Sequence, residues 1–279
     1  MTVKIVTDSV ADLPSEVVEE LGITVVPLNV RFGTDVYREG IDITADQFYE
    51  KLKQSKILPI TSVPAPAAFT QVYNRLAEET NEILAITLTS RLSGTYEVAV
   101  QSSKLVTRKC QIEVIDSKWA ASAEGLIVIT AARAAQTGAS LGDIRATVRS
   151  SISRVELRGA FDTLEYLKRG GRIGKAQALL GSMLKINPII GVKDGEVFPF
   201  GKERSRAKAL DHLYNFAIRY RNIEKLAVEY ATALDDANEL LERLSTRFPK
   251  EHILRSRVSP VIGTHTGPGL IVVSVLGDR

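Results

Sequence analysis

Short segments rich in hydroxyl groups and acids recur along this chain, most of them directly after an apolar run. They are Thr7-Asp8-Ser9, Thr61-Ser62, Ser93-Gly94-Thr95, Asp116-Ser117 and Gly263-Thr264-His265-Thr266-Gly267. In open parallel sheets, ligands bind beyond the carboxyl ends of the strands, where hydroxyl and backbone N–H groups together make an anion site. A single serine or threonine in such a place most often caps a helix. Their repetition at several strand ends favours one shared anion site.

Two of these segments have the most distinctive chemistry. Ser93-Gly94-Thr95 combines two hydroxyls with a glycine that permits close backbone approach, and the helix predicted to begin there has free N–H donors. His265 is one of three histidines and stands in a segment too polar for a core, which predicts a loop. A structural histidine in a turn is the ordinary alternative for His265. His212 and His252 are interpreted as structural.

A second group of residues is basic. Residues 167–175 place four cations around three glycines, and a further basic group contains Lys202, Arg204, Arg206 and Lys208. Glycine-rich basic loops can hold phosphate. The chain has no GxxxxGK followed by Ser or Thr, so this segment is not a P-loop. A solvated surface loop explains these basic residues equally well.

The elements that must position these residues alternate between strands and helices in the first half of the chain. Predicted strands are residues 3–7, 23–30, 82–88 and 112–115. Predicted helices begin near Asp12, Thr44, Ala67, Gly94 and Ala123, and Thr44 has the spacing of a capping box. This alternation is typical of a parallel sheet with helices on both faces, a three-layer α/β arrangement.

After about residue 150 the pattern changes. Strands are predicted at residues 156–161, 186–192, 196–200, 226–230, 253–258 and 270–275, and helices at residues 204–219 and 234–247. Asp194-Gly195 is a tight-turn signal that lets residues 196–200 pair back on the preceding strand. We therefore predict two α/β domains, a parallel-sheet domain over residues 1–150 and a mixed-sheet domain over residues 151–279.

Composition limits the classes of function. The chain has 279 residues, a net charge of +3 and a single cysteine, Cys110, so neither an intrachain disulfide nor a cysteine metal site can form. This predicts a reducing cytoplasm and no metal. The N-terminus lacks the features of a signal peptide, and no apolar run is long enough to span a bilayer. A lipid ligand would therefore be held in a pocket, without stable membrane insertion.

Taken in order, these segments resemble the DegV family over essentially the whole chain. The matching segments are Thr7-Asp8-Ser9, Thr61-Ser62 before Pro64, Leu92-Ser93-Gly94-Thr95-Tyr96, Asp162-Thr163-Leu164-Glu165-Tyr166-Leu167, Gly170-Gly171-Arg172-Ile173-Gly174, Ile189-Ile190 and His265-Thr266-Gly267-Pro268-Gly269. Their order and spacing together are specific.

The resemblance implies two α/β domains with a fatty acid held between them. Proteins like this serve as the binding subunit of bacterial fatty acid kinase, burying a long acyl chain and exposing its carboxylate to a separate ATP-using catalytic subunit. That subunit forms an acyl phosphate, which feeds phospholipid synthesis. The resemblance thus implies a cytoplasmic carrier that is not itself an enzyme and has no cofactor besides its fatty-acid ligand.

The resemblance also implies residue roles at matching positions. The residues implied at the carboxylate are Thr61, Ser62, Ser93, Gly94, Thr95 and His265. Secondary positions near the ligand are Asp8, Ser9, Thr264 and Thr266, and positions for docking the kinase are Arg169, Arg172 and Arg204. The family often has Gln and Ser where this chain has Val63 and Ala65, and residues 270–273 also depart from the pattern. These departures bear on hydrogen bonding around the head group and on the shape of the tunnel.

The chemistry of a fatty acid agrees with these roles. Each buried methylene contributes ~0.8 kcal/mol, whereas a carboxylate buried without partners is costly. Hydroxyl and N–H groups near Thr61 and Ser93 can supply charge-assisted hydrogen bonds. His265, if protonated, would add a counter-charge, because a neighbouring anion favours the charged imidazole.

Three other functions remain to be weighed. Asp8, Ser93 and His265 suggest a serine-dependent acyl hydrolase, although Ser93 lacks the G-x-S-x-G elbow. A sugar or phosphate enzyme with a dinucleotide-like fold is weakened, because no G-x-G-x-x-G follows the first strand. A nucleic-acid binder is disfavoured because only 6% of residues are aromatic and no recognisable module is present. The main prediction is a fatty-acid carrier, with the hydrolase as its alternative.

Overall fold

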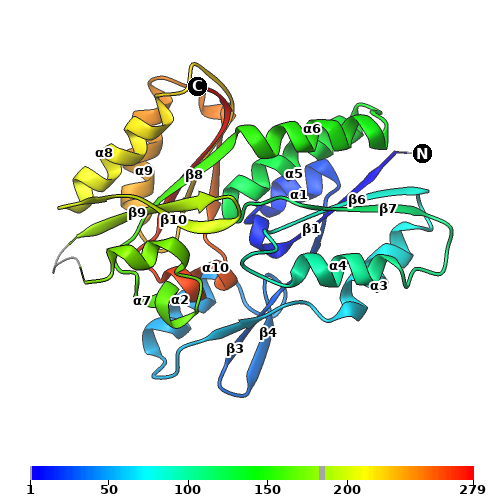
Figure 1. The fold of residues 1–279 in the computed structure, drawn as a ribbon, viewed down its shortest axis with the longest axis horizontal. Helices are drawn as coiled ribbons and strands as arrows, with labels where there is room; N and C mark the ends of the chain where they lie inside the picture. Colours follow the sequence, from blue (N-terminus) through cyan, green and yellow to red (C-terminus); the bar gives the residue numbers. More distant parts are fainter. Residues whose placement is uncertain (1, 182–185) are drawn as a thin grey trace.

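The computed structural model describes residues 2–181 and 186–279, which are built around two large sheets lying side by side (Figure 1). The parallel sheet has the strand order β2-β1-β6-β7. Its strands are β1 (Lys4–Asp8), β2 (Thr24–Val26), β6 (Glu82–Thr87) and β7 (Gln111–Asp116). The central strands β1 and β6 are almost wholly buried, as expected for strands covered on both faces.

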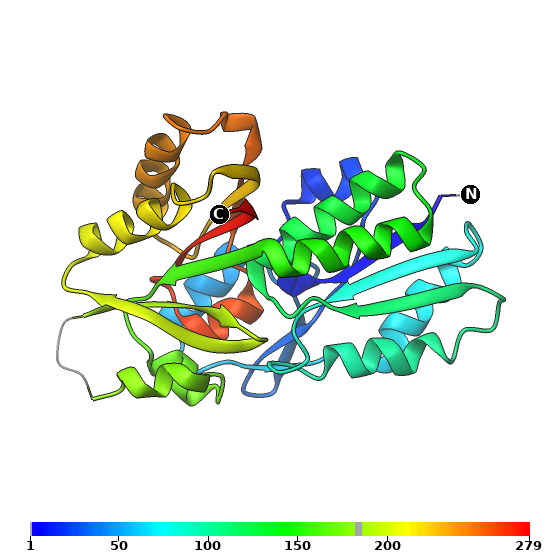
Figure 2. The ribbon, with the colours of Figure 1, turned by 45° about the horizontal axis from the view of Figure 1, so that its top comes forward.

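Helices cover both faces of the parallel sheet (Figure 2). One face carries α1 (Ser15–Leu21), α5 (Ala121–Gln136) and α6 (Leu141–Arg154), and the other carries α3 (Pro66–Leu76) and α4 (Thr95–Ser103). Helix α5 is buried along most of its length because it also contacts strands of the second sheet. The predicted three-layer arrangement is confirmed, although α6 was not predicted from the sequence.

A small antiparallel sheet corrects one predicted strand. Residues 23–30 were expected to form a single strand, but the chain leaves the parallel sheet after β2 and enters β3 (Asn29–Phe32). Pro27 lies between them and has no N–H to donate, so it interrupts the strand. Strand β3 pairs with β4 (Asp35–Arg38) and β5 (Ile60–Ser62), and α2 (Ala45–Gln54) follows β4 with the predicted capping box at Thr44.

The mixed sheet has the strand order β10-β9-β8-β13-β11-β12. Its strands are β8 (Val155–Ala160), β9 (Asn187–Lys193), β10 (Glu196–Glu203), β11 (Asn222–Tyr230), β12 (Ile253–Arg257) and β13 (Ile271–Asp278). Only the β11–β12 pair is parallel, so the predicted mixed sheet is confirmed. Asp194 and Gly195 both have positive φ, which suits the predicted tight turn between β9 and β10.

Helices α8 (Arg206–Ala217) and α9 (Leu234–Ser245) pack on the mixed sheet and bury a core of their own. The predicted division of the chain between residues 150 and 151 falls inside α6, which leads directly into β8. That division stays a prediction. Short helical segments complete the fold: η1 (Ser9–Ala11), α7 (Glu165–Arg169), η2 (Gly174–Leu179), η3 (Lys250–His252) and α10 (Pro260–Thr266).

Helix α10 lies near the C-terminus of the chain. It nevertheless contacts α2, β3 and β5, which belong to the N-terminal part. The segment around His265 was predicted to be a loop, and this prediction is wrong because the segment forms most of α10. Pro260 occupies the first turn of the helix directly after Ser259, a start signal that the polar composition of the segment obscured.

Candidate functional site

An apolar cavity of about 220 Å³ lies between the two large sheets, below the ends of β1 and β6. Its wall on the side of the parallel sheet includes Val10, Leu28, Leu88, Leu92, Ala120 and Ala121. The other wall comes from the mixed sheet and from α7, with Leu157, Phe161, Leu167, Ile190, Val192, Val197, Leu270 and Val272. Both walls are aliphatic or aromatic, so the cavity is suited to a hydrocarbon chain.

Strand periodicity accounts for the wall formed by the mixed sheet. Leu157 and Gly159 lie two residues apart on β8, and Val272 lies beside them on β13, where it pairs with Gly159. Residues two apart in a strand face the same side of a sheet. At Gly159 a side chain would collide with Leu270 and Phe161, because a β-carbon there would stand 3.0 Å and 3.1 Å from their atoms.

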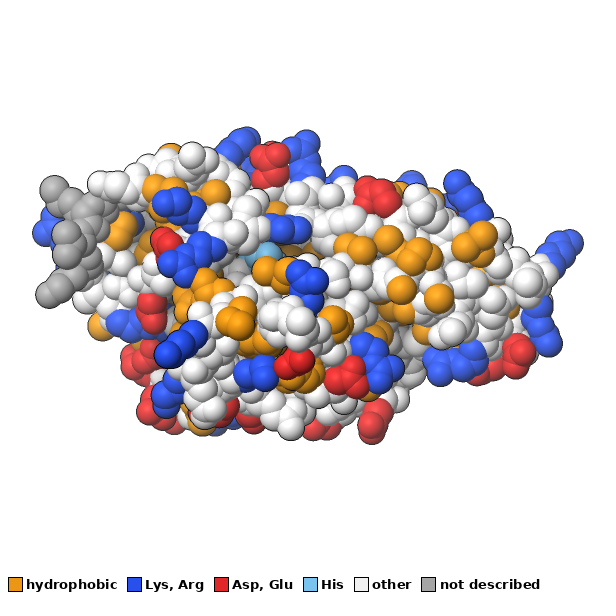
Figure 3. All heavy atoms as spheres, turned by 90° about the horizontal axis from the view of Figure 1, so that it is seen from below, with side chains coloured by type: hydrophobic (Ala, Val, Ile, Leu, Met, Phe, Trp, Pro, Cys, Tyr) orange, Lys and Arg blue, Asp and Glu red, His pale blue; other side chains and the backbone are white. Residues whose placement is uncertain are grey.

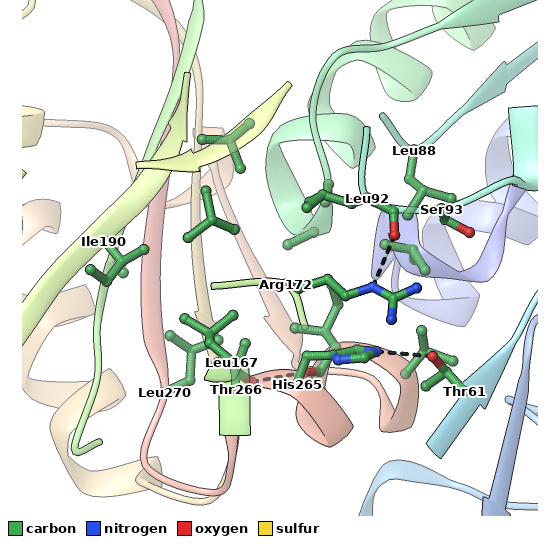
Figure 4. A pocket seen from close by; sticks show the side chains of 18 of the residues that line it. Thr61, Leu88, Leu92, Ser93, Leu167, Arg172, Ile190, His265, Thr266 and Leu270 are labelled. Carbon is green, nitrogen blue, oxygen red and sulfur yellow. Dashed lines mark hydrogen bonds between the residues drawn. The ribbon is translucent and has the colours of Figure 1, made fainter. Parts of the chain in front are cut away.

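The polar side chains of the cavity gather at one end (Figure 4). Thr61 on β5 and His265 on α10 meet there, with Thr61 Oγ1 2.9 Å from His265 Nε2. Ser62, Ser93 and Arg172 also line the cavity. These residues come from positions 61 to 265 of the chain, and the fold brings them together at one end of the cavity. That Thr61, Ser62, Ser93 and His265 bind a carboxylate stays a prediction.

The imidazole of His265 is neutral at pH 7 in this structure. Burial, and to a lesser extent the charge of Arg172, lower the pKa of His265 to about 4. In this state His265 acts as a hydrogen-bonding group. That a neighbouring anion keeps the imidazole charged stays a prediction. Its ring lies against the backbone of Gly170, where a β-carbon would stand 2.1 Å from His265 Nδ1.

Arg172 provides the positive charge at this end of the cavity. Its Nε donates to the carbonyl of Leu92 at 3.2 Å, and its Nη1 donates to the carbonyl of Gly170 at 2.8 Å. These two bonds hold the guanidinium across the opening, between the loop before α4 and the loop after α7. Figure 3 shows this face of the molecule with a histidine set back in a hollow among basic and apolar side chains.

Ser93 lines the cavity, but Gly94 and Thr95 do not. Ser93 Oγ lies 2.9 Å from Thr95 Oγ1, and Thr95 is fully buried at the first position of α4. Gly94 is exposed and lies beside Val63. A β-carbon built on Gly94 would stand 3.9 Å from the Val63 side chain. The structure thus places Ser93 at the cavity and Thr95 behind it, where the Thr95 hydroxyl can orient that of Ser93.

Asp8 and Ser9 support the cavity wall from behind. The buried carboxylate of Asp8 accepts hydrogen bonds from the amides of Val10 at 3.0 Å and Leu88 at 2.9 Å, and Ser9 Oγ accepts from the amide of Leu28 at 2.9 Å. All three amides belong to cavity-lining residues. Burial raises the pKa of Asp8 to about 7, although the two backbone donors oppose the shift.

Thr264 and Thr266 use their hydroxyls within α10. They donate to the carbonyls of Pro260 at 2.8 Å and Ile262 at 3.0 Å, four residues back in each case. Thr266 still lines the cavity, whereas Thr264 is buried away from it.

One known protein family matches almost the whole of this chain. The profile of the DegV family, described as a family of uncharacterised proteins, matches residues 2–278. The chain belongs to the DegV family. A DegV domain-containing protein of Caldanaerobacter subterraneus is 35% identical over 270 residues, which cover 95% of each chain.

Two solved DegV structures are close to this one. A structure described as fatty acid binding of a DegV family protein from Thermus thermophilus has a TM-score of 0.91 and 31% identity, covering 99% of this chain and 100% of the other. DegV of Bacillus subtilis, described as a fatty acid binding protein, has a TM-score of 0.90 and 32% identity, covering 99% of both chains.

This DegV protein does not assemble the triad that the hydrolase alternative needs. Ser93 Oγ is paired with Thr95, His265 Nε2 with Thr61, and Asp8 with two backbone amides. A serine hydrolase requires the histidine to bond both the serine and the acid. The geometry therefore favours binding over acyl transfer.

The three predicted docking arginines have different positions. Arg172 lines the cavity. Arg169 is exposed on α7 and pairs with Glu165 at 2.8 Å, and Arg204 is exposed between β10 and α8.

The apolar wall residues such as Leu157 and Val272 were not predicted individually, although their alternation in strands is a signal that would have indicated them.

Two further observations concern the described part of the chain. Over residues 2–181 and 186–279, no group of three or more His, Cys, Asp or Glu side chains is arranged to hold a metal ion. None of the helices in these residues is long and apolar enough to cross a membrane.

Proposed function

We propose that this DegV protein binds a long-chain fatty acid, with the acyl chain in the cavity and the carboxylate at its polar end. The observation that carries the proposal is the form of the cavity, whose walls are apolar and whose polar groups lie together at one end. Thr61, Ser62, Ser93 and His265 are the proposed hydrogen-bonding partners of the carboxylate. Gly94 and Thr95 act indirectly, through the position of Ser93.

The energetics of a fatty acid suit this arrangement. A long acyl chain gains on the order of 10 kcal/mol from burial at ~0.8 kcal/mol per methylene, before the entropy of binding is subtracted. Its carboxylate needs both hydrogen bonds and a counter-charge. Thr61 and Ser93 offer the hydrogen bonds, and Arg172 offers the counter-charge that a neutral His265 does not supply.

The relatives support the same ligand. The Thermus thermophilus and Bacillus subtilis structures are both described as fatty acid binding, and each matches nearly the whole of this chain. We extend that ligand to this protein, since an apolar cavity with polar groups at one end is present here.

The protein would act as a carrier for a separate kinase subunit rather than as an enzyme. Burial of the acyl chain leaves the carboxylate at the end of the cavity that Arg172 borders. A partner that brings ATP to this opening would transfer the γ-phosphoryl group to a carboxylate oxygen and release ADP, giving an acyl phosphate for phospholipid synthesis. Arg169, Arg172 and Arg204 are the proposed docking residues, and the proposed compartment is the bacterial cytoplasm.

Mass spectrometry tests the ligand directly. The protein is purified from cells without detergent and extracted with organic solvent, and the extract is analysed for lipids. We expect a long-chain fatty acid in near-stoichiometric amount, and less of it in the Ser93→Ala variant. An extract without fatty acid, together with no uptake of added oleate by the purified protein, would contradict the proposal.

A further inference from the structure

A second cavity, of about 560 Å³, lies beside the start of α10 and shares no lining residue with the apolar cavity. Four strands end next to it, the parallel pair β1 and β2 and the parallel pair β11 and β12. Residues at or directly after their carboxyl ends line this second cavity: Asp8, Ser9, Pro27, Tyr230 and Arg257. Because ligands of α/β sheets bind beyond the carboxyl ends of parallel strands, the second cavity has the position of a ligand site.

The lining of the second cavity contains several buried polar atoms without a partner. Among the described residues, buried side-chain atoms that lack a hydrogen-bond partner include five from this lining: Asp12 Oδ1, Glu39 Oε2, Ser256 Oγ, Arg257 Nε and Ser259 Oγ. Nearly all buried polar atoms in folded proteins are paired, and an exception calls for a partner such as a bound molecule. Five exceptions in one lining therefore indicate a polar ligand.

Asp12 and Glu39 form the negative side of the second cavity, and they are only 6% and 4% exposed. One oxygen of each accepts from the start of α10: Asp12 Oδ2 from the Ser259 amide at 3.2 Å, and Glu39 Oε1 from the Val261 amide at 2.6 Å. The hydroxyl of Ser259 approaches both carboxyls, but not in hydrogen-bond geometry to their remaining oxygens. Within the described residues neither acid has a cationic partner, although buried acids are seldom found without one.

Arg255 and Arg257 form the positive side of the second cavity. Arg255 is exposed and donates to the Tyr230 hydroxyl at 3.1 Å, and it forms no ion pair with an acid in the described part of the chain. Arg257 pairs with Asp46 at 2.7 Å, but the Asp46 side chain is 82% exposed. Exposed ion pairs contribute little, so both guanidinium groups can bind an anion.

The two sides of the second cavity do not neutralise each other. Over residues 2–181 and 186–279, no ion pair joins the two acids to the two arginines, although all four line the same space. A ligand with one charge would satisfy only one side. In the same residues no group of acids, histidines or cysteines is arranged for a metal ion, so the acids call for an organic cation. The lining therefore suits a small molecule that carries both charges.

A free amino acid has the required chemistry. Its ammonium group is a compact donor of three hydrogen bonds, which suits two carboxyls that each keep an oxygen without a partner. Its carboxylate matches the planar fork of a guanidinium group. Burial raises the pKa of Asp12 and of Glu39, and an ammonium group beside them would favour the ionised carboxylates.

We propose that the second cavity binds a free amino acid. The ammonium group lies against Asp12 and Glu39, and the carboxylate lies against Arg255 and Arg257. Strands of both large sheets border the cavity, so the ligand bridges the two halves of the molecule. This site is separate from the apolar cavity and does not depend on the proposed binding of a fatty acid.

Thermal unfolding and calorimetry of the 279-residue chain test the proposal. The probes are the common L-amino acids, added singly at millimolar concentration, and D-glucose as an uncharged polyol. A ligand that binds only the folded state raises the unfolding midpoint. We expect at least one amino acid to raise it and to give a saturable isotherm in titration calorimetry. If no amino acid did so, or if glucose had the same effect, the proposal would be overturned.

Two derivatives of the amino acid that binds separate its charges. The N-acetyl form keeps the carboxylate but has no ammonium group, and the amide form keeps the ammonium group but has no carboxylate. Each should bind about tenfold more weakly or worse, because a hydrogen bond between charged groups is lost on one side of the cavity. A derivative that bound as tightly as the amino acid would contradict the pairing with both sides.

Two variants identify the cavity as the place of binding. Arg255→Gln changes an exposed residue and should fold, and Asp12→Asn nearly keeps the shape of the side chain. Each should weaken binding of the amino acid about tenfold. Arg247→Gln, an exposed arginine after α9, is the control and should bind normally. Wild-type affinity in Arg255→Gln would overturn the proposal, even if Asp12→Asn did not fold. Oleate affinity should be unchanged in Arg255→Gln, because Arg255 does not line the apolar cavity.

Discussion

Gly170 lies directly against the imidazole of His265, so that a β-carbon at residue 170 would stand 2.1 Å from Nδ1. The φ of Gly170 is −73°, an ordinary value for any residue, so the requirement for glycine here comes from the ring and not from the backbone. The loop after α7 thus fixes the imidazole from the side opposite Thr61.

Gly170→Ala should therefore displace His265 while leaving the backbone unstrained. We expect the affinity for oleate to fall about tenfold or more, since a hydrogen bond to a charged group contributes about 1.5–3 kcal/mol. Titration with a fluorescent fatty acid measures the loss. Gly142→Ala in α6 is the control, because its β-carbon would meet nothing closer than 3.7 Å, and its affinity should stay at the wild-type value. Equal affinities in both variants would mean that the ring position does not matter.

Thr61→Val tests the hydroxyl on the other side of His265. Valine keeps the size of threonine but removes the oxygen that lies 2.9 Å from His265 Nε2. We expect weaker oleate binding by a factor of roughly 10, with the thermal midpoint little changed, because this end of β5 is only partly buried. Thr70→Val on α3, which removes a hydroxyl bonded within its own helix, should bind normally. A Thr61→Val protein with wild-type affinity would exclude Thr61 from the carboxylate site.

Arg169→Glu separates docking of the kinase from binding of the ligand. Arg169 is exposed, pairs only locally with Glu165 and does not line the cavity, so its reversal should leave oleate affinity unchanged. Formation of acyl phosphate with the partner kinase and ATP should slow several-fold, because surface charges act mainly on association. Arg108→Glu is the control, because Arg108 is similarly exposed and pairs with one acid, Glu78, on another part of the surface. Equal rates for both variants would remove Arg169 from the docking surface.

Local sequence signals predicted local structure well. The capping box at Thr44 forms both of its hydrogen bonds with Gln47, and Asp194-Gly195 makes the tight turn that lets β10 pair with β9. Both features depend on residues within four positions of each other. The predicted strand over residues 23–30 failed for a related reason: Pro27 is also a local signal, and it was given too little weight.

The site was predictable as a set of residues but not as a geometry. Hydroxyl-rich segments indicated Thr61, Ser93 and His265, yet their partners depend on contacts as far as 204 positions apart. The lowered pKa of His265 comes from burial and from Arg172, which a sequence pattern does not report. The hydrogen bonds that Asp12 and Glu39 accept from the amides of Ser259 and Val261, at the start of α10, were not visible at all, since each joins residues more than 200 positions apart.

Asp8 gives the protein a pH-dependent stability that can be measured. Its pKa is about 7 in the fold and near 3.8 when exposed, so the folded state binds the extra proton between these values. The protonated Asp8 carboxyl stabilises the folded state fully below about pH 4, and this contribution is lost as the pH rises towards 7. It amounts to a few kcal/mol, at ~1.4 kcal/mol per pKa unit. His265 acts in the opposite direction between about pH 4 and 6.5, so only the comparison with a variant isolates Asp8.

Urea unfolding of wild type and Asp8→Asn between about pH 4 and 8 makes that comparison. We expect Asp8→Asn to be less stable than the wild type at pH 5. In the wild type both carboxyl oxygens of residue 8 accept from backbone N–H groups, whereas in the variant the side-chain NH2 group faces one of these N–H groups. The difference in unfolding free energy should shrink towards pH 7. Asp143→Asn, which changes an exposed acid in the first turn of α6, should show no such convergence. A constant difference across the range would mean that Asp8 is ionised throughout.

Two neighbouring valines on β13 test whether the cavity holds the acyl chain. Val272 faces the cavity, while Val273 points to the opposite side of the sheet, into the core beneath α8 and α9. A phenylalanine at residue 272 can enter the cavity, so we expect Val272→Phe to fold, to lose affinity for long chains and to retain shorter ones. Val273→Phe has no cavity to fill and should cost about 1–3 kcal/mol of stability.

Affinities for saturated fatty acids of increasing length, measured beside thermal unfolding, distinguish the two variants. The Val272→Phe protein should show a shorter preferred chain and a thermal midpoint near the wild type. The Val273→Phe protein should show the wild-type length preference and a lower midpoint. If Val272→Phe bound every chain length as the wild type does, the acyl chain would have to lie outside this cavity, since a ring of that size cannot share the space with it.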